Sequence, residues 1–360
     1  MTLCKPLINF RKSRLLLTFS VCAFFHLIGC TKDDQSDRDC RNDGVGCTEG
    51  FVCMDTLGQG RYTCDEAPMG GEDVMGGEVV MGGEVVMGGE DVGGGEPIEP
   101  QSLTQISAGR YHTCVLNAEG QVSCWGRDNH GQIVVPEGTY SLISAGQWHT
   151  CALTAEGQPR CWGDDEFGQS GAPEAQLVSV SAGYNHSCGL DSSGIAQCWG
   201  LDDSGRLTPP EASFSQISAG WHHSCGLTSE GAVLCWGMNS EGQSSPPAGT
   251  FTAVTSGGLF SCALDSAGEA RCWGADDYAQ LRAPEGPFNH ISAGADHACG
   301  IRVDDSIICW GRDDREQLNT PGLSFKAVSA GLDHSCGLTT DGAVACWGQN
   351  NHGQSEPILP

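Results

Sequence analysis

The sequence predicts an all-β protein whose main part, residues 101–360, is a seven-bladed β-propeller. One frame of 37 residues occurs seven times in this region, and the spacing of its two cysteines never changes. A fixed period of this size is typical of repeat architectures, in which neighbouring units bury one another's apolar faces. No stretch after residue 101 shows the periodicity of an amphipathic helix. Three or four short strands per copy match the size of a propeller blade, and seven copies fall within the usual number of blades.

Each copy begins with small residues, as in Gln-Ile-Ser-Ala-Gly at 105–109, which favour a strand at a crowded inner edge. A hairpin follows. If Cys114 faces Cys124, the connecting loop is Ala-Glu-Gly at 118–120, and glycine suits its left-handed position. After the Trp-Gly pair, Asn, Asp and Gly mark a turn, and we expect a short outer strand behind it.

The hairpin register places the two cysteines of each copy directly opposite each other. Opposed residues of an antiparallel pair are close enough to form a disulfide. We therefore predict one disulfide within every copy. The pairs are Cys114 with Cys124, Cys151 with Cys161, Cys188 with Cys198, Cys225 with Cys235, Cys262 with Cys272, Cys299 with Cys309 and Cys336 with Cys346.

The repeated frame resembles a known family. Ser-Ala-Gly-x-x-His-x-Cys-x-Leu, then Gly-x-Val-x-Cys-Trp-Gly and Gly-Gln, is similar to the regulator of chromosome condensation repeat over residues 103–354. The similarity is greatest to its bacterial secreted form, which has a cysteine pair in each blade. The resemblance implies a seven-bladed propeller that serves as a protein-binding platform. By analogy alone it also suggests guanine nucleotide exchange or inhibition of an enzyme such as a β-lactamase.

Residues 1–29 predict a lipoprotein signal peptide. Basic residues precede an uncharged apolar run at 15–28, which is too short for a comfortable membrane span. Leu-Ile-Gly-Cys at 27–30 resembles a bacterial lipobox, which implies that Cys30 is acylated and becomes the first residue of the mature chain. The alternative is an ordinary signal peptide with an incidental cysteine. Thr31 after the cysteine favours, by the same resemblance, the outer membrane of a Gram-negative-type bacterium, on its periplasmic or its outer side.

The segment 30–39 is expected to hold the anchor and a short spacer, and residues 40–64 a small cysteine-rich module. Its four cysteines, Cys40, Cys47, Cys53 and Cys64, favour two disulfides, with three connectivities open. A zinc site is the alternative, but the segment has no Cys-x-x-Cys pair and no histidine. With two cysteines in the signal peptide, Cys30 and fourteen in the repeats, all 21 are assigned, as expected in an oxidising compartment.

The composition of residues 65–100 predicts a flexible acidic linker. Met-Gly-Gly-Glu occurs four times there, and ten carboxylates lie among glycines without one basic residue. Such a composition cannot offset the entropy of ordering, and like charges extend the chain. The segment therefore suits a tether that holds the propeller away from the membrane, and a binding function is the alternative.

The charge and the motifs exclude several functions. The net charge is −27, and residues 101–360 carry 28 acidic against 10 basic residues, so nucleic acid and anionic membrane surfaces are repelled. We expect membrane contact through the lipid anchor alone. The sequence has no Gly-x-Ser-x-Gly elbow, no His-Glu-x-x-His and no phosphate-binding loop. We predict that the protein is not an enzyme and binds no cofactor.

Six copies have a histidine two residues before the first cysteine, and Phe260 replaces it in the fifth copy. One imidazole per blade cannot converge on one metal ion, so we predict a structural role, with each histidine hydrogen-bonded to a neighbouring turn. The Asp-rich turns lack the oxygen spacing of a calcium loop, and no metal site is predicted. The histidines are His112, His149, His186, His223, His297 and His334.

Two positions between Ser-Ala-Gly and this histidine do not repeat, so the fold does not dictate them. Equivalent loops of a propeller lie on one face, and aromatic residues grouped on a face are typical of an interface. The alternative is that these rings pack inward around the central channel. The tryptophan of each Cys-Trp-Gly frame is expected to pack between blades. The candidate binding residues are Tyr111, Trp148, Tyr184, Trp221, Leu259 and Phe260.

Together these observations predict a monomeric, envelope-anchored, non-enzymatic module that binds a protein partner, or a glycan, through one propeller face. The alternative is a structural spacer without a specific site. Exposure of Trp148 and Trp221 distinguishes the two hypotheses.

Overall fold

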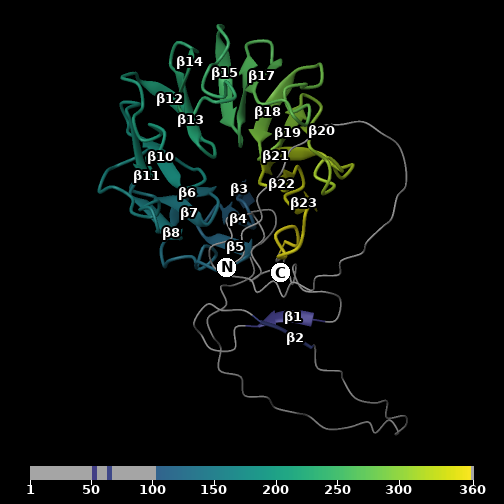
Figure 1. Ribbon diagram of the computed structural model, residues 1–360. Helices are drawn as coiled ribbons and strands as arrows, with labels where there is room; N and C mark the ends of the chain where they lie inside the picture. Colours follow the sequence, from purple (N-terminus) through teal and green to yellow (C-terminus); the bar gives the residue numbers. More distant parts are fainter. Residues whose placement is uncertain (1–50, 55–62, 67–102, 358–360) are drawn as a thin grey trace, which may run out of the picture. The chain divides into compact units, whose positions relative to one another are not determined.

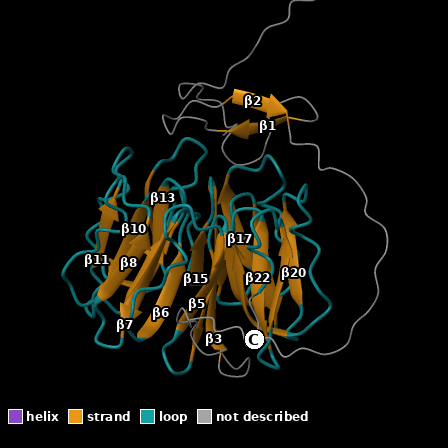
Figure 2. Cartoon of the chain, turned by 90° about the horizontal axis from the view of Figure 1, so that it is seen from below, coloured by secondary structure: helices purple, strands orange, loops and turns teal. Residues whose placement is uncertain are grey.

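The computed structural model describes residues 51–54, 63–66 and 103–357. Residues 103–357 form seven three-stranded antiparallel sheets arranged in a ring, which confirms the all-β, seven-bladed propeller (Figure 1; side view in Figure 2). Separately, β1 (Phe51–Met54) and β2 (Thr63–Glu66) form a two-stranded sheet in which Cys53 and Cys64 are register partners. The predicted signal peptide, the acylation of Cys30 and nearly all of the linker lie outside the described residues.

Three strands form each blade, in chain order from the central channel outward. The inner strands are β3 (Leu103–Ala108), β6 (Tyr140–Ala145), β9 (Ser179–Ala182), β12 (Phe214–Ala219), β15 (Phe251–Ser256), β18 (Phe288–Ala293) and β21 (Phe325–Ala330). The middle strands are β4 (His112–Asn117), β7 (His149–Thr154), β10 (His186–Leu190), β13 (His223–Thr228), β16 (Phe260–Asp265), β19 (His297–Arg302) and β22 (His334–Thr339). The outer strands are β5 (Val122–Gly126), β8 (Pro159–Gly163), β11 (Ala196–Gly200), β14 (Val233–Gly237), β17 (Ala270–Gly274), β20 (Ile307–Gly311) and β23 (Val344–Gly348).

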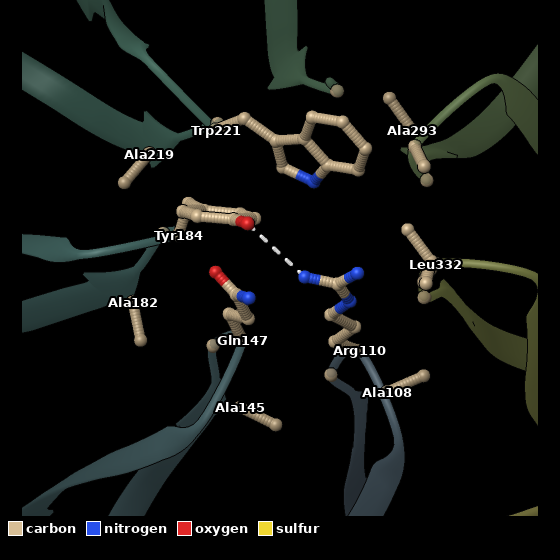
Figure 3. A pocket seen from close by; sticks show the side chains of 18 of the residues that line it. Ala108, Arg110, Ala145, Gln147, Ala182, Tyr184, Ala219, Trp221, Ala293 and Leu332 are labelled. Atoms are coloured by element: carbon tan, nitrogen blue, oxygen red, sulfur yellow. Dashed lines mark hydrogen bonds between the residues drawn. The ribbon is translucent and has the colours of Figure 1, made fainter. Parts of the chain in front are cut away.

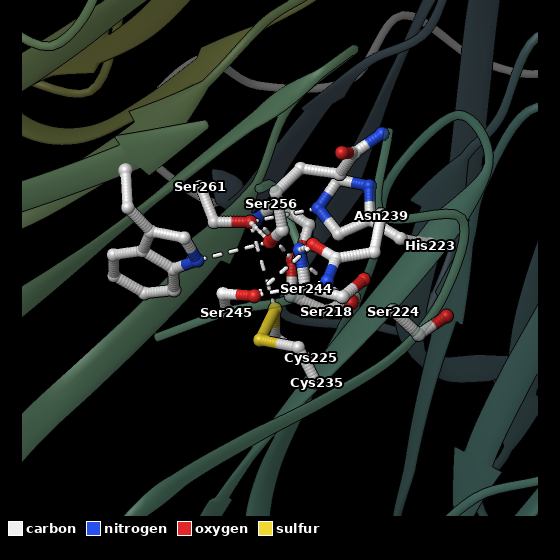
Figure 4. Close-up of a disulfide and its surroundings, with 12 residues drawn as sticks. Ser218, His223, Ser224, Cys225, Cys235, Asn239, Ser244, Ser245, Ser256 and Ser261 are labelled. Carbon is white, nitrogen blue, oxygen red and sulfur yellow. Dashed lines mark hydrogen bonds between the residues drawn. A yellow bond between two sulfur atoms is a disulfide. The ribbon is translucent and has the colours of Figure 1, made fainter. Parts of the chain in front are cut away.

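The middle and outer strands of each blade form the predicted hairpin. Cys114 lies opposite Cys124 in the first copy, and the same register recurs in the other six. Gly120 has the left-handed φ of 81° that the loop requires, and in the sixth copy Asp305 adopts it with φ 63°. All seven intra-repeat disulfides are present, with Cα atoms 4.0–4.1 Å apart, as Figure 4 shows for Cys225 and Cys235.

The prediction of an outer strand after Trp-Gly is wrong. This segment forms turns, and each sheet ends at its third strand. A buried glutamine organises the turn instead. Gln132 Oε1 accepts the N–H of His130 at 2.9 Å, and the main-chain carbonyl of Gln132 accepts the indole N–H of Trp162 in the next blade at 2.9 Å. Hydrogen bonds to side chains therefore satisfy backbone groups of this segment, which forms a fourth strand in other propellers.

The repeated histidines hold adjacent blades together. His112 Nε2 is hydrogen-bonded to Thr150 Oγ1 of the next blade at 2.8 Å, and that hydroxyl donates to the carbonyl of Gln132 at 3.0 Å. Because the hydroxyl proton is used there, the imidazole donates from Nε2 and is neutral. The partner is thus a strand residue and not the expected turn. Burial lowers the pKa to about 3 for His112, His223 and His334, to about 4 for His149 and His297, and well below 6.5 for His186.

The fifth copy replaces both partners of this hydrogen bond. Phe260 stands in the place of the histidine, and Ala298 in the next blade stands in the place of the hydroxyl residue. Both side chains are fully buried and pack in one apolar cluster. Replacing both members of a buried hydrogen bond by apolar groups is nearly neutral, whereas replacing one leaves the other unsatisfied. Phe260 is therefore a core residue and contributes nothing to a binding surface.

The ring closes without a shared strand. Around the channel, the residue after each Ser-Ala-Gly donates its N–H to the glycine carbonyl of the next blade, from Arg110 to Gly146 at 3.1 Å through to Leu332 to Gly109 at 3.2 Å. A Cβ atom on Gly109 would lie 2.4 Å from the Gly146 oxygen, so this approach requires glycine. At the periphery, Trp125 donates to the carbonyl of Gln354 at 3.0 Å.

Candidate functional site at the mouth of the channel

The loops between inner and middle strands form one face of the propeller, which we call the channel-mouth face. Leu103 pairs with Asn117 at the other end of the first blade, so the described propeller begins on the opposite face. Both positions of each loop that vary between copies lie on the channel-mouth face, but they differ in direction. Six of the seven first positions line a pocket of about 100 Å³ at the mouth, whereas the second positions do not. They are Arg110, Gln147, Tyr184, Trp221 and Leu332, which Figure 3 labels, and Ala295; the seventh first position is Gly258.

Four of the candidate aromatic residues lie together, and we call Tyr111, Trp148, Tyr184 and Trp221 the aromatic cluster. The ring centroids of Tyr111 and Trp148 are 5.0 Å apart, and those of Tyr184 and Trp221 are 5.5 Å apart. All four side chains are half-buried. The predicted exposed arc is thus two pairs of tilted rings, with interplanar angles of 43° and 53°. Tyr184 and Trp221 turn toward the channel, as the alternative hypothesis proposed for all four.

Arg110 joins the two pairs. Its guanidinium carbon lies 4.9 Å from the ring centroid of Tyr111, 5.5 Å from that of Trp148 and 5.6 Å from that of Tyr184. Its Nη1 also donates to the Tyr184 hydroxyl at 3.1 Å. Arg127 adds a second cation, 4.7 Å from the Trp148 ring. Contacts of this kind between cations and ring faces are worth about 0.5–2 kcal/mol each, so the cluster is held as one unit.

Gln147 completes the polar side of the cluster. With its amide oxygen turned toward the neighbouring donors, it accepts from the Tyr184 hydroxyl at 3.1 Å, from Arg110 and from the indole N–H of Trp148. Leu259 is half-buried, does not line the pocket and has no place in the cluster. The sequence hypothesis named neither Arg110 nor Gln147 as a site residue. The signal was present, because both occupy the non-repeating positions, but the hypothesis considered only aromatic and apolar side chains there.

An arginine replaces the buried glutamine in the third copy and supports the loop of Trp221. The side chain of Arg206 is fully buried, and its Nη1 donates to the main-chain carbonyl of Trp221 at 3.3 Å. Its Nη2 contacts Asp203 and lies 3.0 Å from His222 Nδ1. Burial, and then the charge of Arg206, lowers the pKa of His222, so this imidazole is neutral and accepts the hydrogen bond.

The opposite side of the same face is acidic. Arg312 lies 3.3 Å from Asp296, 3.8 Å from Asp333 and 2.6 Å from Asp314, and we call these four residues the aspartate cluster. Asp296 and Asp333 occupy second loop positions, equivalent to Tyr111 and Trp148. Burial raises the pKa of both carboxyl groups, and the nearby arginine partly offsets this effect. On this side of the face the arginine therefore has carboxylate partners from its own chain.

The chemistry available at the channel mouth is recognition chemistry: a guanidinium group, a phenol hydroxyl, an indole N–H and aromatic faces. Among residues 103–357, no three His, Cys, Asp or Glu side chains are grouped so that they could hold a metal ion. In the described part of the chain, no helix has the length and apolar character needed to cross a membrane.

These features define a disulfide-bonded propeller of repeats with a varied loop face. Residues 103–132, 141–169, 177–206, 214–243, 251–280, 288–317 and 325–354 match the Regulator of chromosome condensation (RCC1) repeat. The chain belongs to this family.

Solved structures agree with this assignment. The propeller is similar to the entire ectodomain of the receptor kinase CR4 from Physcomitrella patens, with 28% identity and a TM-score of 0.61 over 69% of this chain and 74% of that one. It is also similar to the CRINKLY WD40 ectodomain of the Arabidopsis thaliana receptor kinase ACR4, with 28% identity and a TM-score of 0.59 over 69% and 97% of the two chains. Prp20p from Saccharomyces cerevisiae shares the fold at 16% identity, with a TM-score of 0.55 over 64% and 80%. A search of curated protein sequences found no match.

Proposed function

We propose that this protein is a non-enzymatic, lipid-anchored module of the bacterial cell envelope that binds a protein partner through the aromatic cluster. The observation that carries the proposal is the grouping of four aromatic side chains and Arg110 in loop positions that the repeat leaves free. Tyrosine, tryptophan and arginine are the residues that most often dominate protein interfaces. Because the frame folds in the copies that lack these side chains, the frame does not require them.

The fold is suited to such a role. Prp20p, which shares it, is described by its binding properties toward Gsp1p and histones. In this chain, the acidic propeller argues against nucleic acid as the partner, since 28 acidic residues face only 10 basic ones. A spacer without a specific site is the alternative, and it predicts that the loop residues can be exchanged freely.

The test is quantitative capture from envelope extract and culture medium by the full-length protein. We expect the wild-type chain to retain a specific protein that the double variant Tyr111→Ala/Trp148→Ala releases. The matched control is Asp296→Ala/Asp333→Ala, which changes the equivalent second positions of the sixth and seventh copies. If the wild-type chain retains no specific protein, the spacer hypothesis is supported; equal retention by all three proteins would place the interface outside the aromatic cluster.

Anchoring is tested separately through Cys30. We expect Cys30→Ser to move the protein from the membrane fraction to the soluble fraction, because loss of the acyl chains removes the contact that holds it. The propeller should keep its melting temperature, since residue 30 lies far along the chain from the first blade. Unchanged membrane partitioning of the variant would contradict the lipoprotein hypothesis.

A further inference from the structure

Arg110 differs from other arginines of the channel-mouth face in its partners. Arg312 has three aspartates within 4.0 Å, and Arg206 has Asp203. No carboxylate of the described residues forms an ion pair with Arg110, whose contacts are three aromatic rings, the Tyr184 hydroxyl and Gln147. Within the described chain, Arg110 is thus held by aromatic rings and neutral polar groups, in a propeller with 28 acidic residues.

The guanidinium of Arg110 also retains hydrogen-bonding capacity. Its Nε is buried and, like the Nε of Arg206 and of Arg312, has no hydrogen-bond partner among the described residues, but only Arg110 also lacks a carboxylate beside it. A buried donor without a partner costs about 1–3 kcal/mol, and more when it belongs to a charged group. The surrounding rings hold the side chain through their faces, which fixes its position without neutralising its charge. The site is thus preorganised for an acceptor that the described chain does not supply.

The pocket beside Arg110 offers further donors. Figure 3 shows the guanidinium, the Tyr184 hydroxyl and the indole nitrogen of Trp221 turned toward the same space. The Trp221 N–H makes no hydrogen bond to a described residue, and its ring packs where a Cβ on Gly258 would lie 3.3 Å away. Gln147, Ser256, Leu332 and a ring of alanine and glycine residues form the remaining wall, and the volume of about 100 Å³ admits a group the size of one short side chain.

We propose that the partner of this face places one carboxylate in the channel-mouth pocket, where it pairs with Arg110 and accepts from Trp221. This inference rests on the proposed protein-binding function and specifies its chemistry. Guanidinium groups bind carboxylates through paired N–H donors, and an indole N–H adds a third. Because the propeller is strongly acidic, the partner surface as a whole is not acidic, and the carboxylate is an isolated feature of it.

The source of the carboxylate is either an acidic side chain or the C-terminus of the partner chain. Three probes separate them: acetyl-Gly-Gly-Glu-amide carries only a side-chain carboxylate, acetyl-Gly-Gly-Gly carries only a terminal one, and acetyl-Gly-Gly-Gln-amide carries none. Each is titrated into the full-length protein while the tryptophan indole N–H signals are followed by NMR. We expect saturable shifts of the Trp221 signal with at least one carboxylate probe and none with the glutamine probe.

Variants test the role of Arg110. Arg110→Gln should weaken binding of the carboxylate probe at least tenfold and lower the melting temperature only by what the lost ring contacts contribute, and Arg110→Lys should retain part of the binding. The control Arg312→Gln should bind the probe as the wild type does. Trp221→Phe should weaken binding by a smaller factor, because it removes one donor and keeps the ring.

The outcomes separate this inference from the proposed function. If neither carboxylate probe shifts Trp221, or if Arg110→Gln binds as well as the wild type, the carboxylate pocket is refuted even where the aromatic double variant loses partner capture. If the probes bind but capture is unchanged in the aromatic double variant, the protein-binding role fails and the pocket is a small-anion site. Equal shifts with chloride or inorganic phosphate would also overturn the proposal, because the site would then lack specificity for carboxylates.

Discussion

The channel-mouth face has two sides built from the same loop. In the first four copies the varied positions hold the aromatic cluster around Arg110, and in the sixth and seventh copies they hold Asp296 and Asp333 beside Arg312. The backbone hydrogen bonds that run around the channel are the same on both sides. The difference teaches that the repeat fixes where these side chains stand, whereas their chemistry is free to change from copy to copy.

The two sides also differ in how their charges are satisfied. Arg312 is neutralised by aspartates of its own chain, whereas the charge of Arg110 lies among ring faces. An arginine with its own counterions gains little from a partner, because binding must first replace contacts already made. We therefore expect binding energy to come from the aromatic side, and the following experiments test this contrast.

The largest expected effect concerns the stability of the repeated frame on which both sides are built, and it depends on the six buried histidines. Burial lowers the pKa of all six histidines in the folded protein, to about 3 or 4 for five of them and well below 6.5 for His186, so the unfolded chain takes up protons first as the pH falls. Full stability is present above pH 6.5, and each histidine removes about 1.4 kcal/mol per pH unit below it. The raised pKa values of Asp296 and Asp333 act in the opposite direction near pH 4, but they are two groups against six. Urea unfolding of the oxidised protein at pH 7, 6 and 5 measures the slope.

The fifth copy supplies the control for this slope. Phe260→His with Ala298→Ser installs a seventh pair and should steepen the pH dependence by one further histidine. Phe260→His alone should lower the free energy of unfolding by about 1–3 kcal/mol at pH 7, because its N–H then lacks a partner. A flat pH dependence between 7 and 5 would show that the histidines are not held neutral.

The next effect separates frame tryptophans from loop tryptophans. Trp199→Ala should lower the free energy of unfolding by about 3–5 kcal/mol, because the buried ring packs between blades and donates to the carbonyl of Gln169 at 3.0 Å. Trp148→Ala should cost clearly less, since this ring is half-buried. Thermal unfolding of both variants measures the difference. Equal losses would make the aromatic cluster part of the core.

A smaller effect is expected on binding. Trp148→Ala and Trp221→Ala should each weaken partner capture by about 2 kcal/mol or more, which is the size typical of interface hot spots. The affinity of each purified variant for the captured protein gives the value. Leu259→Ala is the matched control, because it alters the equivalent loop of the fifth copy, outside the cluster. A loss with Leu259→Ala as large as that with Trp148→Ala would place the interface elsewhere on the face.

The smallest effect is expected on the acidic side. Asp296→Ala and Asp333→Ala should change partner affinity by no more than about 0.5 kcal/mol at physiological salt, since charges at the rim of an interface act mainly at long range. Association rates at two ionic strengths measure this contribution. A large loss that persists at high salt would mean that the aspartate cluster makes direct contacts.

The sequence was sufficient for the fold and for the hairpin register. The invariant spacing of Cys114 and Cys124 determines which residues face each other, because a shift of one residue would turn them to opposite faces of the sheet. The expected fourth strand failed for a physical reason. The side chain of Gln132 accepts a backbone N–H of that segment, which a neighbouring strand would otherwise satisfy. Strand propensities do not reveal a hydrogen bond of this kind between a side chain and the backbone.

The direction and burial of the site side chains were harder to predict from the sequence. The two free positions were identified correctly as the variable ones, but Tyr184 and Tyr111 differ by one position in the loop and therefore point to different places. Phe260 was misjudged because its aromatic character was weighed without its buried register position, which Ala298 shares across the blade interface. The role of Arg110 depends on the rings of Trp148 and Tyr184 from other copies, which lie 38 and 74 residues away in the chain and meet it only in the folded ring.

The closure of the ring has a consequence for circular permutation of the propeller. The contact of Trp125 with Gln354 repeats the contact between any two consecutive copies, and each sheet is completed by one continuous stretch of chain. The ring therefore does not depend on the propeller beginning at residue 103 and ending at residue 357. A circular permutant opened in the turn between any two blades, with the old ends joined, should assemble the same ring.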